Sequence, residues 1–239
     1  MGIRQWAVYG VGGIALVLIL GHVVEASRRE TPLPALSARQ IWRAAQSAVA
    51  TEPFGETLAV SGPHQPPVWE NLYENGPFSW RLETLSTSGL PRTVSARQGT
   101  VVGLWTYRST GVTTRLWSGI AGAPDPWASA LSWSWQSGWQ PRVRITDIQG
   151  LRAYEVQFRP SRPAPSTPEV WWWFQAPYFI PLGVRWQIGH VTWQAMPLVF
   201  TNGSPDTSAN PPPSLHPRRQ SGRASPAGLW AWPFNGQMP

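Results

Sequence analysis

The stretch EVWWWFQAPYFIPLGVRW, Glu169 to Trp186, holds three tryptophans in a row and ends on a fourth. Side chains of an extended strand alternate between two faces, so Trp172 and Phe174 share one face and Trp171 and Trp173 share the other. Such a strand is apolar on both sides and needs cover on both. We expect Trp172 and Phe174 to face a core or cavity. We expect Trp171 and Trp173 to be covered by a helix, by the chain's tail or by a partner.

Around this stretch, from Gly55 to Thr201, short runs alternate apolar and polar residues and are separated by glycine and proline. This pattern is typical of antiparallel strands with one covered face and one wet face. Counting the runs predicts roughly eight to eleven strands. The clearest runs are Phe78–Glu83, Val101–Tyr107, Val112–Leu116, Ala153–Arg159 and Leu182–Gly189.

A helix is predicted to precede the strands. Ser37 suits the N-cap and Gln40 the third helical position, which together form a capping box. Pro53 ends the helix. The residues that recur at helical spacing form an apolar stripe for packing against the sheet: Ile41, Trp42, Ala45, Ala48 and Val49.

A second, shorter helix is predicted within Pro124–Gly138. Trp127, Ala130, Leu131 and Trp135 recur there at helical spacing. Strands together with few helices indicate the α+β class, with the helices gathered on one face of the sheet. The predicted architecture is a curved antiparallel sheet that forms an open half-barrel, with one or two helices packed on it.

The amino terminus, residues 1–27, carries an almost wholly apolar run from Trp6 to Val24 behind a single arginine, Arg4. The run is about long enough to cross a bilayer. Val24-Glu25-Ala26 also resembles a small-residue cleavage site. The segment is therefore either an uncleaved membrane anchor, which its length favours, or a cleaved signal peptide. Both interpretations export the rest of the chain.

The remaining chain divides by composition. Residues 28–35 read as a linker that contains proline, and residues 36–202 as the half-barrel domain. Residues 203–239 are rich in proline, serine and glycine, which predicts a disordered tail.

The charge and the cysteine count exclude several classes of function. The chain of 239 residues has no cysteine, so disulfides, thiolate metal sites and cysteine nucleophiles are excluded. Its net charge of +7 comes from arginines scattered along the chain. A nucleic-acid-binding protein is expected to cluster its cations in a stripe. We therefore predict no nucleic-acid partner.

Motifs for catalysis are lacking in the sequence. The four histidines have no partner at metal-ligand spacing, and no glycine-rich phosphate loop or nucleophile elbow is present. We predict no enzyme, no catalytic residue, no metal and no cofactor. A hydrolase would need a carboxyl pair such as Glu83 with Glu155 in one cleft. The scattered carboxylates fit surface pairs with arginine better.

Large apolar side chains are the abundant feature, with 17 tryptophans, 7 phenylalanines and 5 tyrosines. Each buried aromatic removes about 150–250 Å² from water. Two interpretations are open. The aromatics fill a core between the sheet and the helices, or part of the concave face stays unfilled and holds an apolar ligand.

The order of the motifs resembles a known family. Four degenerate patterns follow one another, at Pro77–Arg81, at Leu104–Tyr107, from Gly150 to Pro160, and from Val170 to Pro181. In this order they resemble the outer-membrane lipoprotein carrier and sorting family (LolA-like), with its relatives among lipoprotein localisation factors and the MucB/RseB-type regulators of sigma factors. The resemblance covers about residues 36 to 200. Gln175 stands where the family has aspartate.

The resemblance implies an open half-barrel whose concave apolar face binds acyl chains of lipids or lipoproteins, without catalysis. The alternative it implies is a membrane-anchored sensor or regulator that binds another envelope protein. Either protein would be held at the cell membrane by the amino-terminal helix, or exported if that helix is cleaved. The candidate ligand-lining residues are Trp80, Leu82, Trp105, Tyr107, Tyr154, Val156, Phe158, Trp172, Phe174, Trp186, Ile188 and Trp193.

Overall fold

The computed structural model describes residues 32–63, 66–76, 78–118, 126–132, 138–162, 164 and 167–203. The chain divides into two compact units, Met1–Ala35 and Leu36–Pro239. All helices and strands described below belong to the second unit. The predicted amino-terminal anchor, the first half of the linker and nearly all of the predicted tail lie outside the described residues. None of the described helices has the length and apolar character that a membrane span requires.

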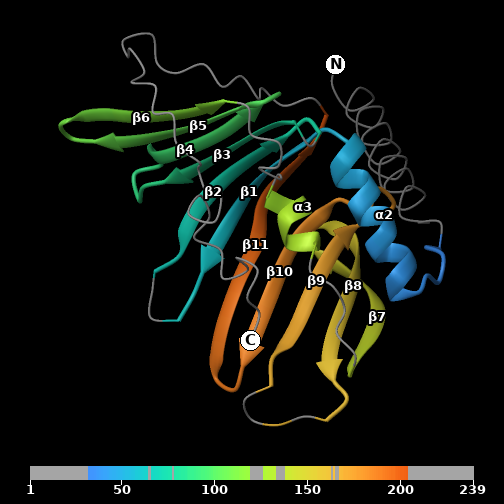
Figure 1. Cartoon of the computed structure of the whole chain (residues 1–239). Coiled ribbons are helices and arrows are strands. Elements are labelled where there is room, and N and C mark those ends of the chain that lie inside the picture. The colour runs from blue at the N-terminus through green and yellow to red at the C-terminus, as the bar shows by residue number, and fades with distance from the viewer. Residues whose placement is uncertain are drawn as a thin grey trace, which may run out of the picture. The chain divides into compact units, whose positions relative to one another are not determined.

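The described strands form one open antiparallel sheet of eleven strands (Figure 1). Their order across the sheet is β6-β5-β4-β3-β2-β1-β11-β10-β9-β8-β7, so β1 pairs with β11 and the two halves of the chain meet at the middle. The strands are β1 Phe54–Ser61, β2 Val68–Glu74, β3 Ser79–Leu85, β4 Pro91–Gln98, β5 Val101–Arg108, β6 Gly111–Ser118, β7 Trp139–Ile148, β8 Leu151–Pro160, β9 Glu169–Gln175, β10 Pro181–Ile188 and β11 Val191–Asn202.

Helix α2, Ala38–Thr51, begins where the sequence predicts. The Gln40 amide donates to the Ser37 hydroxyl at 3.3 Å, and the Ser37 amide donates to the Gln40 side chain at 2.9 Å. This reciprocal pair satisfies two N–H groups that an uncapped helix leaves unbonded. The predicted apolar stripe is buried, and Ala38 is buried with it.

Helix α3, Pro126–Leu131, is shorter than the predicted segment Pro124–Gly138. Trp127, Ala130 and Leu131 are buried as expected. The Ser132 amide donates to the carbonyl groups of Ala128 and Ser129, and this bifurcated bond closes the helix. Trp135 lies outside the described residues.

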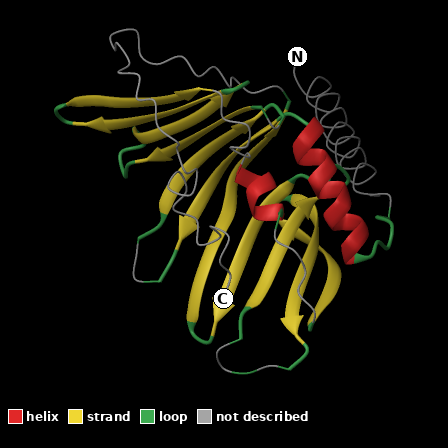
Figure 2. Cartoon of the chain, in the orientation of Figure 1, coloured by secondary structure: helices red, strands yellow, loops and turns green. Residues whose placement is uncertain are grey.

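Both helices lie against the same side of the sheet, which curves around them (Figure 2). Trp42 of α2 contacts Phe158, Trp172 and Phe174, and Trp127 of α3 contacts Trp172. We call this side of the sheet the helix face and the opposite side the outer face. The predicted class, an open antiparallel half-barrel with helices packed on it, is confirmed.

Candidate ligand-binding face

The helix face is continuously apolar over Tyr154–Phe158 of β8, Val170–Phe174 of β9 and Val184–Ile188 of β10, and Arg152 lies on the same face at the start of β8. Residues directly opposite each other in neighbouring strands point to the same face. Trp172 lies opposite Val156 and Val184, so every second residue of β8, β9 and β10, counted from these three, lies on the helix face. The apolar side chains that share this face are Tyr154, Val156, Phe158, Val170, Trp172, Phe174, Val184, Trp186 and Ile188.

Trp172 lies at the centre of this face and is fully buried. Its ring centroid is 5.1 Å from that of Trp42 at 78°, 5.8 Å from Trp127 at 57°, and 6.0 Å from Phe174 in a stacked pair. Edge-to-face and offset-stacked pairs at such distances add to the stabilisation from area burial. The two helices therefore meet the sheet through aromatic rings.

A shared hydrogen-bond acceptor joins the two helices. The carbonyl of Leu131, the last residue of α3, accepts from the Trp42 indole at 3.3 Å and from the Gln46 amide at 3.2 Å. Carbonyls at the end of a helix lack a partner within the helix. Here α2 supplies the partners and fixes the end of α3 above the sheet.

The register places ten of the twelve predicted lining residues on the helix face. Trp80 and Leu82 are included, because Leu82 lies opposite Leu72, which in turn lies opposite Glu56 beneath α3. Trp193 is included because it lies opposite Trp186, and the two rings stack at 4.5 Å. The other seven are Tyr154, Val156, Phe158, Trp172, Phe174, Trp186 and Ile188.

Trp105 and Tyr107 were predicted to share this face, and for them the prediction is wrong. Trp105 lies opposite Val94, which lies opposite Glu83, and Glu83 points away from its neighbour Leu82. Trp105 and Tyr107 therefore lie on the outer face, in a separate apolar cluster with Val94, Ala96, Val112 and Leu116. A large apolar side chain does not identify the helix face when the outer face has its own cluster.

Three buried glutamates on the helix face were not predicted. Phe54, Glu56 and Leu58 alternate on β1, and Glu70, Leu72 and Glu74 alternate on β2. All six are at most 3% exposed. The signal was present in the sequence, because each glutamate stands two residues from a large apolar residue. The helix face of β1 and β2 is thus apolar surface interrupted by carboxyl groups.

Glu56 lies beneath α3. The Trp127 indole donates a hydrogen bond to Glu56 Oε1, whereas Oε2 is buried and has no hydrogen-bond partner among the residues that the structure describes. Burial raises the pKa of the Glu56 carboxyl well above its usual value, and the bond from Trp127 only partly offsets this. The protonated acid is favoured because an unpaired carboxylate is costly to remove from water.

The outer face of β9 is covered by side chains from neighbouring strands. Trp173 packs in a cluster with Ala153 and Leu182, and this cluster also contacts Ile148, Leu151, Trp171, Met196 and Phe200. The Arg185 guanidinium carbon lies 5.1 Å from the ring centre of Trp171. In the part of the chain that the structure describes, sheet residues thus provide cover that we expected from a helix, the tail or a partner.

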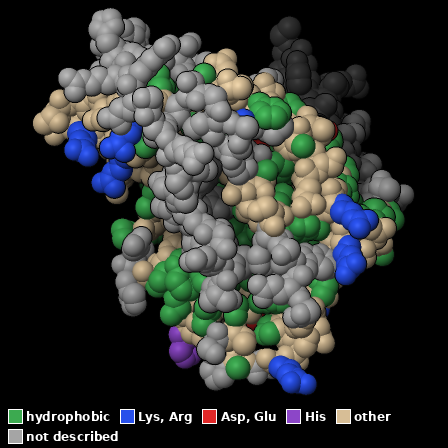
Figure 3. Space-filling view, viewed as in Figure 1, with side chains coloured by type: hydrophobic (Ala, Val, Ile, Leu, Met, Phe, Trp, Pro, Cys, Tyr) green, Lys and Arg blue, Asp and Glu red, His purple; other side chains and the backbone are tan. Residues whose placement is uncertain are grey.

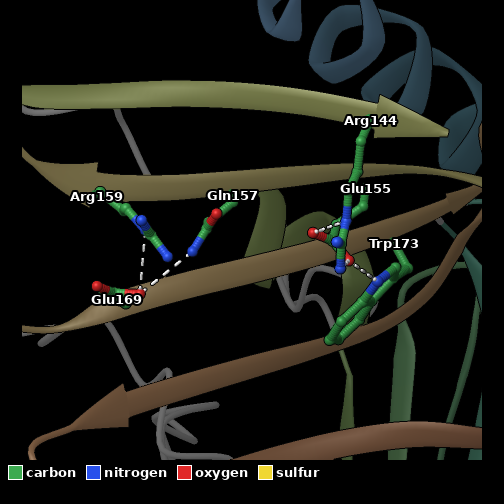
Figure 4. Close-up of polar contacts among 6 residues, drawn as sticks. All are labelled: Arg144, Glu155, Gln157, Arg159, Glu169 and Trp173. Atoms are coloured by element: carbon green, nitrogen blue, oxygen red, sulfur yellow. Dashed lines mark hydrogen bonds and ion pairs between the residues drawn. The ribbon is translucent and has the colours of Figure 1, made fainter. Parts of the chain in front are cut away.

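A polar clamp fixes Trp173 on this outer face (Figure 4). Its indole donates to Glu155 Oε2 at 2.9 Å, and Arg144 contacts both oxygens of the same carboxylate at 2.7 and 2.8 Å. A second group on β8 and β9 joins Gln157 and Arg159 to Glu169 at 3.2 and 3.3 Å. Carboxylates of this half of the sheet are therefore engaged in structural pairs.

The described side chains offer no metal site. Within the described ranges, no group of three or more histidine, aspartate or glutamate residues is arranged to hold a metal ion. The apolar part of the helix face can exclude water and contact a hydrocarbon chain. On the helix face of β1, Glu56 adds a buried carboxyl oxygen that no described residue hydrogen-bonds.

No protein-family model matches this chain, and no curated protein matches it in sequence. Solved structures do match. An uncharacterized conserved protein from Thermus thermophilus is 13% identical, with a TM-score of 0.50 over 77% of this chain and 100% of that one. This likeness is one of fold alone.

Two further matches have lower TM-scores. The Pseudomonas aeruginosa MucA/MucB complex matches at 13% identity and a TM-score of 0.47, over 70% of this chain and 57% of that one. The LolA superfamily protein NE2245 from Nitrosomonas europaea matches at 11% identity and a TM-score of 0.29, over 72% of this chain and 96% of that one.

Proposed function

We propose that this protein is a non-enzymatic, extracytoplasmic binding protein. It holds acyl chains of a lipid or lipoprotein between the helix face of β8–β10 and the helices α2 and α3. The amino-terminal segment, as an anchor or a cleaved signal, places the domain outside the cytoplasm. The order of sequence motifs described above supports the same proposal.

One observation carries the proposal. Over Tyr154–Phe158 of β8, Val170–Phe174 of β9 and Val184–Ile188 of β10, every side chain on the helix face is aliphatic or aromatic. Pockets for apolar ligands are lined in this way, with few polar groups. The outer face of the same strands has arginine and glutamate among its tryptophans. A hydrocarbon chain would thus find a matching surface on the helix face.

An acyl chain has to take the place of aromatic rings. Trp42 and Trp127 lie directly on Trp172. Helix α3 has only six residues, and its buried residues are Pro126, Trp127, Ala130 and Leu131. It is the smaller of the two covers, so we propose that Trp127 moves aside and the chain lies along Trp172 and Phe174.

Two tryptophans on opposite faces give a matched test. Trp193 on β11 is half-buried on the helix face, stacked on Trp186, and Trp171 on β9 is half-buried on the outer face. Native mass spectrometry of the full-length protein, with palmitate or a diacyl phospholipid added, measures lipid occupancy. Trp193→Ala is expected to weaken binding about tenfold through lost apolar contact, and Trp171→Ala to leave it unchanged.

Thermal unfolding of both variants separates loss of binding from loss of folding. Similar melting temperatures with different lipid occupancy support the proposal. Equal occupancy in the two variants, or a wild-type protein that takes up neither lipid, contradicts it. The alternative function, a membrane-anchored regulator that binds an envelope protein, would leave occupancy at zero in all three proteins.

A further inference from the structure

The two edges of the sheet differ in how they are protected. Strand β6 is one edge and β7 is the other. Strand β6 pairs with β5 in an unbroken register from Arg108↔Gly111 to Val101↔Ser118, and among the described residues no strand lies on its other side. An edge strand presents unpaired N–H and C=O groups to any extended chain that reaches it.

Strand β7 carries features that block such pairing. Pro141 lacks an N–H and interrupts the edge, and the exposed Arg142 and Arg144 follow it. Arg144 is also engaged by Glu155. Strand β6, GVTTRLWS, has no proline and no bulge, and it has one charged residue, Arg115. The edge that remains competent for pairing is therefore β6.

The region next to this edge has cations without anions. Strands β4, β5 and β6 contain Arg92, Arg97, Arg108 and Arg115 and no aspartate or glutamate. Blue arginine side chains gather over the β5–β6 end of the sheet in Figure 3. Arg97 is buried and donates to the Gly99 carbonyl at 2.9 Å. Arg108 and Arg115 are exposed, and no ion pair joins them to another described residue.

The register fixes which face each side chain of the edge occupies. Arg115 lies opposite Leu104, and Arg108 stands four residues after Leu104 on β5, so both guanidinium groups project from the helix face. Val112 and Leu116 lie opposite Tyr107 and Gly103 on the outer face, where they contact the Trp105 cluster. A strand added beside β6 would meet cations on one face and apolar side chains on the other.

We propose that the free edge of β6 binds an extended segment of a partner protein in which acidic and apolar residues alternate. The backbone of that segment pairs with β6. Its carboxylates face Arg115 and Arg108, and its apolar side chains extend the outer-face cluster of Val112 and Leu116. This interaction does not depend on lipid binding, because it lies on the half of the sheet away from β8–β10.

A second copy of this chain is a poor occupant. Two copies can pair antiparallel through β6 about a two-fold axis, with the faces of the sheet continuous. If the axis passes at Thr114, the two Arg115 side chains lie two residues apart. If it passes at Arg115, they lie directly opposite each other. Two residues correspond to roughly 7 Å. Like charges on neighbouring strands are destabilising, and β6 has no acid to compensate them. The charge that opposes self-pairing is the charge that selects an acidic partner.

The experiment uses the full-length protein and two labelled ten-residue peptides, one alternating glutamate with valine and one alternating lysine with valine. Fluorescence anisotropy measures their binding. The Glu/Val peptide is expected to bind and the Lys/Val peptide is not. The double variant Arg108→Glu, Arg115→Glu reverses both charges and should weaken binding of the Glu/Val peptide about tenfold. The effect is limited because each exposed ion pair between peptide and protein contributes modestly. The control is Arg142→Glu, an exposed arginine on the other edge, which should change nothing.

Hydrogen exchange then tests the backbone contact. On binding of the Glu/Val peptide, amide groups of β6 should gain protection, and a peptide N-methylated at alternate residues should not bind. The proposal is overturned if the Glu/Val peptide fails to bind the wild-type protein. It is also overturned if Arg142→Glu weakens binding as much as the double reversal, or if β6 amides stay unprotected. If the double reversal unfolds the protein, Arg115→Gln alone should still weaken binding, and no weakening contradicts the proposal.

Discussion

The two halves of this sheet use their helix faces differently. Over Tyr154–Phe158, Val170–Phe174 and Val184–Ile188 the helix face is a continuous apolar surface centred on Trp172, and the charged residues Glu155 and Arg185 point outward. Over β1–β4 the helix face carries the buried polar groups Glu56, Glu70, Glu74, Ser95 and Arg97 among its apolar residues. The apolar cluster around Trp105 is on the outer face of β4–β6, on the same side of the chain's midpoint as β1–β3.

This difference assigns different tasks to the two halves. A hydrocarbon chain is matched by the β8–β10 half, where the helix face is apolar around Trp172 and its charged side chain, Arg152, lies at the start of β8. Polar groups in the β1–β4 half require hydrogen bonds to stay buried at acceptable cost. That half is therefore suited to hold the sheet in a defined arrangement, and to meet polar or charged partners.

Removing the central tryptophan of each half gives the largest expected effect. Trp172→Ala should lower the free energy of unfolding by about 3–5 kcal/mol, because the ring is fully buried between both helices and leaves a cavity. Trp105 is 3% exposed and packs on the outer face, where a Cβ added at Gly103 would collide with its ring. Urea denaturation followed by circular dichroism measures both changes.

Trp105→Ala should cost about 1 kcal/mol less than Trp172→Ala, because the partly buried side chains that cover Trp105 can move into the space it leaves. Equal losses would mean that the outer-face cluster is as much a core as the helix face. A larger loss for Trp105→Ala would contradict the assignment of the main core to β8–β10.

The sequence predicted the faces of the β8–β10 strands better than those of the β1–β6 strands. Alternation within β9 predicted which of its tryptophans share a face, and the capping box predicted where α2 begins. Alternation does not say which face of one strand matches which face of the next. That depends on the register across each turn, and a shift of one residue inverts a strand. Trp105 and Tyr107 were misplaced for this reason.

Polar residues within apolar strands were the second limit of the sequence. Glu56 alternates with Phe54 and Leu58, a pattern that places it on the apolar face, but carboxyl groups are seldom buried without a partner. Its contact with Trp127 joins residues 71 positions apart in the chain. No local pattern reveals a contact of this kind.

Glu56 should make stability depend on pH. Its pKa is raised in the folded state by burial, so the folded protein keeps the proton at pH values where the unfolded chain has released it. Stability is then fully present below the ordinary glutamate pKa and is lost as pH rises toward the folded-state pKa. The slope for one proton approaches about 1.4 kcal/mol per pH unit.

The variant Glu56→Gln isolates this contribution. Urea denaturation between pH 4 and pH 8 should show the free energy of unfolding falling less steeply for Glu56→Gln than for the wild-type protein. Glu52→Gln, at the exposed end of α2, serves as the control and should keep the wild-type slope. Equal slopes for all three proteins would mean that Glu56 is ionised in the folded state.

A smaller effect is expected from the polar clamp on the outer face of β8–β9. Glu155→Gln should cost about 1–2 kcal/mol, because the charge that engages Arg144 and the Trp173 indole is lost from a site where Glu155 is 4% exposed. Arg144→Gln should cost less than about 1 kcal/mol, since the Arg144 side chain is 70% exposed. Thermal unfolding at low and high salt checks this order, and a larger loss for Arg144→Gln would contradict it.

The smallest effect tests how Trp171 is covered on the outer face. Arg185 lies over its ring at 5.1 Å and donates to Gln187 at 2.9 Å. Arg185→Gln should cost about 0.5–1 kcal/mol, the usual range for a cation over an aromatic ring near the surface. The corresponding pair in the other half, Arg97 over Phe78 at 4.9 Å, places a buried guanidinium on an exposed ring.

Arg97→Gln should therefore lower the free energy of unfolding more than Arg185→Gln does, because the buried Arg97 loses hydrogen bonds as well as its contact with the ring. Thermal unfolding measures both, and a larger loss for Arg185→Gln would show that the ring contact is the stronger term.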